Sequence, residues 1–151
     1  MKVYYSNEKI IKGQKSIFLA GTTVQDRAND WRKQVVKLLE LAGYDGVVYN
    51  PDYTDLKVKN SYENQLKWEL KGISKATAIL FWVDRDMPDR PGLTTNVEFG
   101  YWLHSGRVVY GRPNSSEKCL YLDMLYKLKT GKTPCCSLKE VVNKTLEFLN
   151  E

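Results

Sequence analysis

This chain of 151 residues has little of several features that mark common protein classes. It contains one histidine, His104, which excludes metal sites built from several imidazoles and leaves carboxylates as the main candidates for acid–base chemistry. The three cysteines, Cys119, Cys135 and Cys136, lack metal-ligand spacing and are odd in number, which favours reduced structural thiols. We therefore expect no bound metal.

Long apolar runs and blocks of like charge are also missing. No run approaches the roughly 18 residues of a membrane span, and the first residues lack the apolar segment of a signal peptide. A cytoplasmic protein with no membrane partner is expected. The net charge of +5 is spread along the chain, so no nucleic-acid partner is expected, although a mild positive field favours a small anionic substrate.

The composition that is present is ordinary for a globular protein, with 42% hydrophobic and 27% charged residues. The length suffices for one sizeable core, and no linker, repeat or low-complexity segment divides the chain. We expect a single domain spanning residues 1–151.

Apolar runs alternate with helical periodicities along this domain. Strands are predicted at 16–20, 46–50, 76–83 and 107–111, an edge strand or hairpin within 1–15, and helices at 31–42, 61–74, 95–105 and from 137 onward. The apolar residues 119–128 fit either a strand or a helix. Alternating strands and helices form a parallel sheet covered on both faces, so we predict an α/β domain with about five parallel strands.

The stretch from 76 to 101 is richest in chemically useful side chains. Its strand is followed by a loop with three aspartates, and hydroxyl, amide and carboxylate side chains then open a helix: Asp84, Asp86, Asp89, Thr94, Thr95, Asn96 and Glu98. In open α/β sheets, ligands bind at the carboxyl ends of central strands, and helix N-termini stabilise anions. The loop Gly21-Thr22-Thr23 after the 16–20 strand suits either a phosphate cradle or a simple chain reversal.

Two carboxylates flank the 76–83 strand, and each has two interpretations. Thr95-x-x-Glu98 matches a capping box, which spacing alone favours, but a carboxylate kept ionised by the helix dipole also suits a nucleophile. Glu69 falls on the same helix face as the apolar residues Tyr62, Leu66, Leu70 and Ile73. It is either an edge glutamate that reaches water or a carboxylate that is paired or used, and the spacing does not decide.

Trp68 falls on the opposite, lysine-rich face of that helix. A large aromatic side chain on such a face predicts a subunit contact, and hence a homodimer or a larger homo-oligomer.

Taken together, these motifs resemble the nucleoside 2-deoxyribosyltransferase-like superfamily, and most closely its branch of CMP and hydroxymethyl-CMP N-glycosidases of the mildiomycin pathway type. The matching residues are Ile17-Phe-Leu-Ala-Gly21, Trp31-Arg32, Gly43-Tyr-Asp-Gly46, Trp68-Glu69, Ile79-Leu-Phe-Trp-Val83, Leu93-Thr-Thr-Asn-Val-Glu-Phe-Gly100, Ser105-Gly-Arg107 and Gly111. The resemblance implies a flavodoxin-like (Rossmann-like) fold. It also implies an enzyme that cleaves or exchanges the N-glycosidic bond of nucleosides or nucleotides without a cofactor or metal.

The resemblance also assigns roles to individual residues. It implies that Glu98 attacks the anomeric carbon to form a glycosyl-enzyme and that Glu69 is the second catalytic acid. Gly21, Thr22 and Thr23 would touch the sugar and its 5′ end. Thr94, Thr95 and Asn96 would receive a 5′-phosphate or 5′-hydroxyl.

Two departures from the family pattern concern the substrate. The first loop lacks the Gly-Pro start and the following basic residue of the mildiomycin enzyme. Gly92 stands where the deoxyribosyltransferases carry an aspartate that contacts the base, and Asp84, Asp86 or Asp89 could substitute for it.

The chemistry needs one ionised and one protonated carboxylate, because an oxocarbenium-like transition state forms beside them. Glu69, which faces the core, is expected to have the raised pKa. Phe18 and Trp82 are either walls for the base or plain core residues.

The leading hypothesis is hydrolysis of a pyrimidine nucleoside 5′-monophosphate that releases free base. The alternatives are base exchange by a deoxyribosyltransferase and a non-catalytic nucleotide-binding or sensor module, and a flavin carrier is a weaker third reading.

Overall fold

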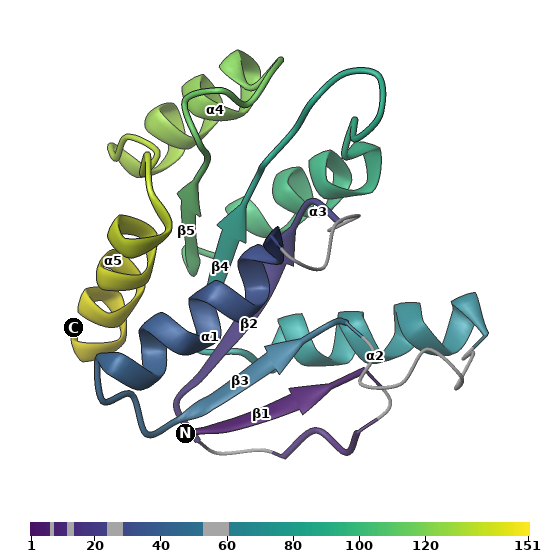
Figure 1. The fold of residues 1–151 in the computed structure, drawn as a ribbon, viewed down its shortest axis with the longest axis vertical. Coiled ribbons are helices and arrows are strands. Elements are labelled where there is room, and N and C mark those ends of the chain that lie inside the picture. The colour runs from purple at the N-terminus through teal and green to yellow at the C-terminus, as the bar shows by residue number, and fades with distance from the viewer. Residues whose placement is uncertain (7, 12–13, 24–28, 53–60) are drawn as a thin grey trace.

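The computed structural model describes residues 1–6, 8–11, 14–23, 29–52 and 61–151, in which strands and helices alternate (Figure 1). The strands are β1 (Lys2–Tyr5), β2 (Ser16–Gly21), β3 (Val47–Asn50), β4 (Ala78–Trp82) and β5 (Val108–Gly111). The helices are α1 (Trp31–Leu41), α2 (Tyr62–Lys75), α3 (Leu93–Leu103), α4 (Leu120–Thr130) and α5 (Leu138–Asn150). The predicted elements are therefore present, and the undecided residues 119–128 fall in helix α4. Residues 7 and 12–13 of the predicted edge strand or hairpin within 1–15 lie outside the described residues.

The strands form one sheet in the order β1-β3-β2-β4-β5, and every neighbouring pair is parallel. Strand β1 pairs with β3, so the edge strand is confirmed and the alternative of a hairpin is wrong. The chain leaves β2 for β3 on one side and later enters β4 on the other side of β2. Such a reversal of strand order opens a crevice at the carboxyl ends of β2 and β4, which is where ligands bind in this architecture.

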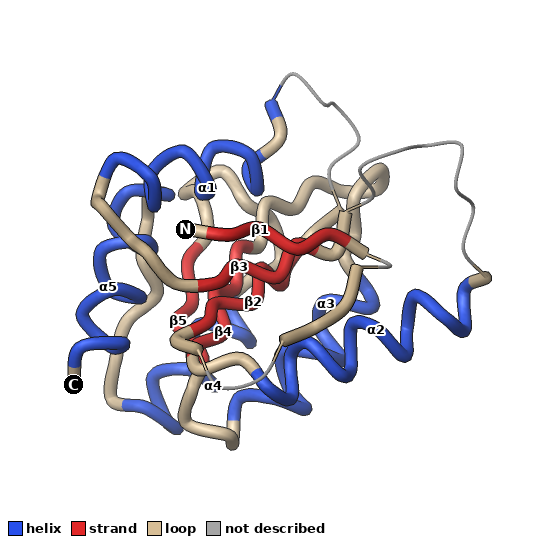
Figure 2. Tube along the Cα trace, turned by 90° about the horizontal axis from the view of Figure 1, so that it is seen from below, coloured by secondary structure: helices blue, strands red, loops and turns tan. Residues whose placement is uncertain are grey.

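Helices cover both faces of the sheet, as Figure 2 shows with the strands in red and the helices in blue. Helices α2, α3 and α4 share one hydrophobic core with the sheet, and α1 and α5 share the other. Phe18 lies in the first core and Leu19 in the second, because successive strand side chains point to opposite faces. Both faces of these strands are buried, which explains why their sequences are continuous apolar runs instead of alternating patterns.

Helix α5 presents the face that its periodicity predicts, with Val141, Val142, Thr145 and Leu149 buried. The Ser137 hydroxyl caps this helix by accepting a hydrogen bond from the Glu140 backbone N–H at 3.2 Å. The Glu140 carboxylate accepts from the Cys136 N–H instead of the Ser137 N–H, so Ser137 and Glu140 form only half of a capping box.

Helix α2 is rotated relative to the prediction. Trp68 is only 9% exposed, packs against Phe18 with ring centroids 6.3 Å apart, and donates its indole N–H to the Glu8 carbonyl at 2.8 Å. Gly72 lies on the same face, where a Cβ atom would come within 3.0 Å of the Phe18 ring, so a glycine lets the helix approach the sheet.

The apolar stripe that was expected to face the core is largely exposed. Tyr62, Leu66 and Leu70 are 78%, 41% and 47% exposed, and of that stripe only Ile73 is buried. The prediction of a subunit contact through Trp68 is therefore wrong, because its indole fills the core of its own chain. Both faces of α2 carry large apolar side chains, so periodicity alone could not choose between them.

Among the described residues, no helix has both the length and the apolar character that a bilayer crossing requires.

Candidate active site

A cavity of about 210 Å³ opens beyond the ends of β2 and β3, between helices α2 and α3. Six of the residues expected at the site line it: Gly21, Thr23, Glu69, Thr94, Thr95 and Glu98. They come from three separate segments of the chain, the end of β2 with its loop, α2 and α3, and the crossover of the sheet brings them together. The cavity lies at the carboxyl edge of the sheet beside the crevice between β2 and β4, and α3, which follows β4, forms one of its walls.

Glu98 is not a helix cap. Helix α3 begins at Leu93, two residues earlier than predicted, and its N-cap is Gly92, whose backbone is left-handed (φ +59°) and makes no side-chain cap hydrogen bond. Glu98 therefore lies in the second turn, too far along the helix to bond back to the N-cap residue. The capping-box interpretation is wrong, and Glu98 instead lines the cavity, half-buried.

Glu69 enters the same cavity from α2. It is half-buried beside Trp68, and one of its carboxylate oxygens accepts a hydrogen bond from the Gln65 side chain at 2.9 Å. Of its two interpretations, the exposed edge glutamate does not apply, because the side chain faces the cavity.

The electrostatics of the two carboxyls differ from the expectation. Burial, together with the charge of Glu69, raises the pKa of Glu98 to about 7 against the opposing charge of Arg32. Burial also raises the pKa of Glu69, whereas the hydrogen bond from Gln65 and the charge of Arg32 lower it. The expectation that the helix dipole keeps Glu98 ionised is wrong, because the dipole acts within the first turn. The pair instead retains protons toward neutral pH.

The loop after β2 depends on Gly21. Its φ of +143° and its contact with β4, where a Cβ would lie 1.9 Å from the Trp82 carbonyl oxygen, admit only glycine. Thr22 is buried: its hydroxyl accepts from the Asp84 N–H at 3.0 Å and its carbonyl accepts from the Trp31 indole at 2.9 Å. Thr22 and Asp84 therefore join the two loops, whereas Thr23 lines the cavity. The rest of the first loop, from residue 24 to 28, lies outside the described residues.

Asn96, Asp84 and Asp86 were also expected at the site, but their side chains bond to arginines that do not line the cavity. The Asn96 side-chain oxygen accepts a hydrogen bond from the Arg85 guanidinium. Asp84 and Asp86 both pair with Arg90, at 3.6 and 2.6 Å.

The two aromatic residues that were candidate walls for the base lie on opposite faces of the sheet. Phe18 lines the cavity, whereas Trp82 lies in the core on the opposite face of the sheet.

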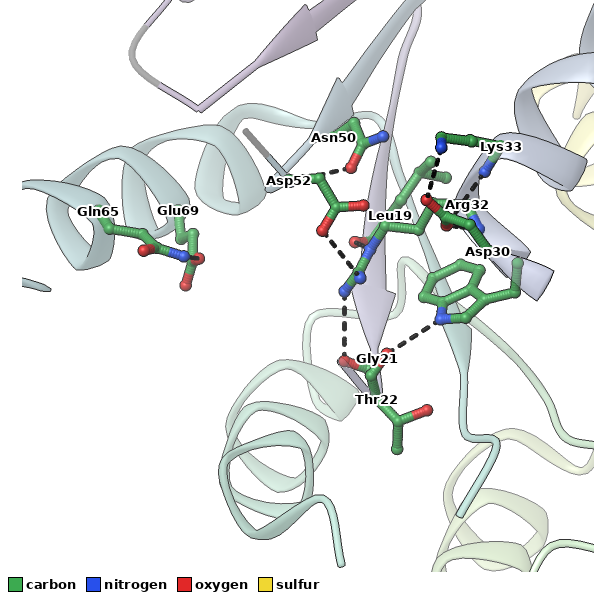
Figure 3. Close-up of polar contacts among 11 residues, drawn as sticks. Leu19, Gly21, Thr22, Asp30, Arg32, Lys33, Asn50, Asp52, Gln65 and Glu69 are labelled. Carbon is green, nitrogen blue, oxygen red and sulfur yellow. Dashed lines mark hydrogen bonds and ion pairs between the residues drawn. The ribbon is translucent and has the colours of Figure 1, made fainter. Parts of the chain in front are cut away.

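Two residues at the cavity were not expected there. Arg32, the second residue of α1, and Asp52, which follows β3, both line it and form an ion pair with 3.3 Å between Nη1 and Oδ1 (Figure 3). The sequence signals that could have pointed to them are an arginine in the first turn of a predicted helix and an aspartate directly after Asn50-Pro51. No group of three or more His, Cys, Asp or Glu side chains in the described part of the chain could hold a metal ion.

A second, apolar cavity of about 180 Å³ adjoins the first. Glu69, Glu98 and Phe18 line both cavities, and the second adds Leu70, Val97 and other apolar side chains of α2 and α3. The carboxylates thus lie between a polar chamber and an apolar groove.

The fold and the site define an α/β protein with paired carboxylates at the crevice of a parallel sheet. A sequence profile described as "Nucleoside 2-deoxyribosyltransferase like" matches residues 14–115. The chain belongs to this family of enzymes, as its sequence motifs indicated.

The fold also resembles that of a solved structure described as "2-desoxiribosyltransferase from Leishmania mexicana". The two share 20% sequence identity with a TM-score of 0.56 over 88% of this chain and 97% of the other. No curated protein matches the sequence. The assignment to the branch of CMP N-glycosidases stays a prediction.

Proposed function

We propose that this protein cleaves the N-glycosidic bond of a pyrimidine nucleoside 5′-monophosphate, with Glu98 as nucleophile and Glu69 as acid and base. The observation that carries the proposal is the convergence of these two carboxyls on one cavity, at the ligand crevice of the sheet. Burial raises the pKa of both carboxyls, that of Glu98 to about 7, and the reaction uses the form of the pair in which Glu98 is ionised and Glu69 holds the proton.

The reaction proceeds in two displacements. The ionised Glu98 oxygen forms a bond to the anomeric carbon, and the electron pair of the breaking C–N bond leaves with the base. Glu69 in its protonated form delivers the proton that the leaving base takes up. Water then attacks the anomeric carbon, Glu69 accepts a proton from that water, and the sugar leaves with the Glu98 carboxylate regenerated.

The remaining lining residues suit the other parts of the substrate. The hydroxyls of Thr23 and Thr94 and the backbone of Gly21 offer hydrogen-bond donors for a 5′-phosphate. The net charge of +5 favours an anionic substrate over a neutral nucleoside. Phe18 offers an aromatic surface for the base.

Base exchange differs from hydrolysis only in the second step, where a second base replaces water. The same pair of carboxyls serves both reactions, and the family description fits the exchange. A non-catalytic nucleotide sensor has no use for two half-buried carboxyls that repel each other, since their burial costs stability.

The deciding experiment incubates the protein with a panel of nucleoside 5′-monophosphates and the matching nucleosides, with and without a second base, and measures free base. We expect base release from a pyrimidine monophosphate in water alone and none with Glu98→Gln. Release that requires the second base would assign the exchange reaction. Equal cleavage of a nucleoside and its monophosphate would refute the phosphate preference, and no cleavage of any member would contradict the proposed function.

The protein acts as a homodimer or larger homo-oligomer in this proposal, through α2 and α3 instead of Trp68. Among the described residues, thirteen large hydrophobic side chains are exposed, and ten of them lie on α2, α3 and α4: Tyr62, Leu66, Leu70, Leu93, Val97, Tyr101, Leu120, Tyr121, Met124 and Leu128. Exposed apolar patches of this extent mark interfaces.

A second copy of the chain fits this surface because the patch is continuous with the apolar groove beside the catalytic carboxyls. A subunit that covers α2 and α3 would therefore also shield the reacting centre from water.

A further inference from the structure

Arg32 occupies an unusual position for a charged residue. It lies in the first turn of α1, is only 4% exposed, and its guanidinium stacks on the Trp31 ring with 4.6 Å between the guanidinium carbon and the ring centroid. Figure 3 draws it reaching past Leu19 toward Gly21 and Asp52, with Glu69 on helix α2. A buried guanidinium is costly unless its charge is compensated or used.

The described partners of Arg32 lie at long hydrogen-bond distances. Its Nε lies 3.5 Å from the Leu19 carbonyl oxygen, its Nη2 lies 3.4 Å from the Gly21 carbonyl oxygen, and its Nη1 lies 3.3 Å from the Asp52 carboxylate. Strong N–H···O bonds are about 2.7–3.2 Å long. A guanidinium has five N–H groups, so these three long contacts leave part of its hydrogen-bonding capacity for the cavity.

The charges around the cavity are unbalanced. Among the described residues that line it, Arg32 of α1 is the sole cation, and the carboxylates are Asp52 after β3, Glu69 of α2 and Glu98 of α3. Tyr62, at the entrance, is the other titratable side chain in the described lining. Asp52 pairs directly with Arg32, whereas Glu69 and Glu98 form no ion pair with any described residue.

We propose that Arg32 is a positioning residue for the proposed reaction: its buried guanidinium stabilises the ionised form of the Glu69–Glu98 pair, and Asp52 limits how strongly it does so. The role of Arg32 in the reaction rests on the proposed function, whereas its effect on the charge of the two carboxyls does not. It adds a third and a fourth residue to the machinery, neither of which touches the reacting atoms.

The direction of each effect follows from the sign of the charges. The Arg32 charge lowers the pKa of Glu98 against the dominant effect of burial, and it also lowers the pKa of Glu69. The Asp52 charge raises the pKa of Glu69. A nucleophile must be ionised, so removal of Arg32 would leave Glu98 protonated and inactive over more of the neutral range. Removal of Asp52 would act in the opposite direction.

Carbon-13 NMR titration of the glutamate carboxyls tests this without any substrate, with the signals assigned from Glu69→Gln and Glu98→Gln. In Arg32→Gln we expect both midpoints to rise, by about one pH unit. Arg32→Lys, which keeps the charge, should give a smaller rise. In Asp52→Asn the Glu69 midpoint should fall. The acidic limb of the pH profile of kcat/KM should move with the NMR midpoints.

Arg112→Gln is the matched control, because Arg112 also pairs with an aspartate, Asp123 at 2.7 Å, away from the cavity. It should move neither midpoint. Unchanged midpoints in Arg32→Gln, or a rise in Asp52→Asn, would overturn the proposal, and Asp52→Asn decides alone if Arg32→Gln does not fold. If the wild-type protein cleaves no nucleotide, the proposed function fails while the titration still decides the role of Arg32.

Discussion

Glu69 and Glu98 face one cavity from two different helices, and the charge of Glu69 helps to raise the pKa of Glu98 to about 7. Neither carboxyl caps a helix, and no described cation forms an ion pair with either. A site that keeps two acidic groups half-buried and close to each other loses stability, so their retention points to chemistry.

Glu98→Gln should abolish turnover while leaving the fold intact. An amide of the same size fills the same space but cannot attack an anomeric carbon, so base release should fall by orders of magnitude. Because Glu98 makes no cap interaction, the circular dichroism spectrum and thermal unfolding at pH 4 should match those of the wild type. The measurement is base release from the best nucleotide of the panel. A variant that keeps near-wild-type release would remove Glu98 from the mechanism.

The stability of the protein should fall as the pH rises from about 4.5 to about 7. The folded state holds the Glu98 proton up to about pH 7, whereas the unfolded chain releases it near 4.5, so the folded state binds more protons in this window. At about 1.4 kcal/mol per pKa unit, the loss attributable to Glu98 is at most about 3 kcal/mol, reached above pH 7.

Urea denaturation of wild type and Glu98→Gln across this pH range measures that loss. The variant lacks the titrating group, so it should be the more stable protein at pH 8 and match the wild type at pH 4. Glu69 is present in both proteins, and its contribution cancels to first order. A difference between the two proteins that is the same at pH 4 and pH 8 would show that the pKa of Glu98 is not raised.

Trp68→Ala should destabilise the protein by about 3–5 kcal/mol, the range for a large aromatic removed from a core. The side chain packs on Phe18 and its indole bonds to the Glu8 carbonyl, so both contacts are lost. Tyr62→Ala, on the exposed face of the same helix, should stay within about 0.5 kcal/mol of the wild type. Urea denaturation at submicromolar concentration measures both, and equal effects would contradict the observed rotation of α2.

Leu93→Glu should shift self-association toward the monomer. Leu93 is 71% exposed on the α3 side of the molecule, and a carboxylate placed in an apolar interface is desolvated without a partner. Leu41→Glu is the matched control, because Leu41 is 76% exposed on α1, across the sheet. Sedimentation velocity at micromolar concentration measures the difference. A wild-type protein that is monomeric under these conditions would rule out the proposed dimer.

The sequence alone determined the elements and the class of fold. Runs such as 16–20 and 79–83 are too short and too uniformly apolar for surface helices, and their alternation with helices required parallel strands. Helix α5 was also placed correctly, because only one of its faces is apolar. The motifs around Glu98 identified the family, since local spacing carries that information.

Tertiary structure decided which face of α2 is buried and how strongly Glu69 and Glu98 hold their protons. The two faces of α2 compete for the core, and the fit of Trp68 and Gly72 against Phe18 settles which face is buried, a contact between residues far apart in the chain. The pKa of Glu98 depends on burial and on two charges brought by other segments, Glu69 of α2 and Arg32 of α1. Sequence periodicity reports what one element prefers, whereas packing and electrostatics depend on what the rest of the chain places beside it.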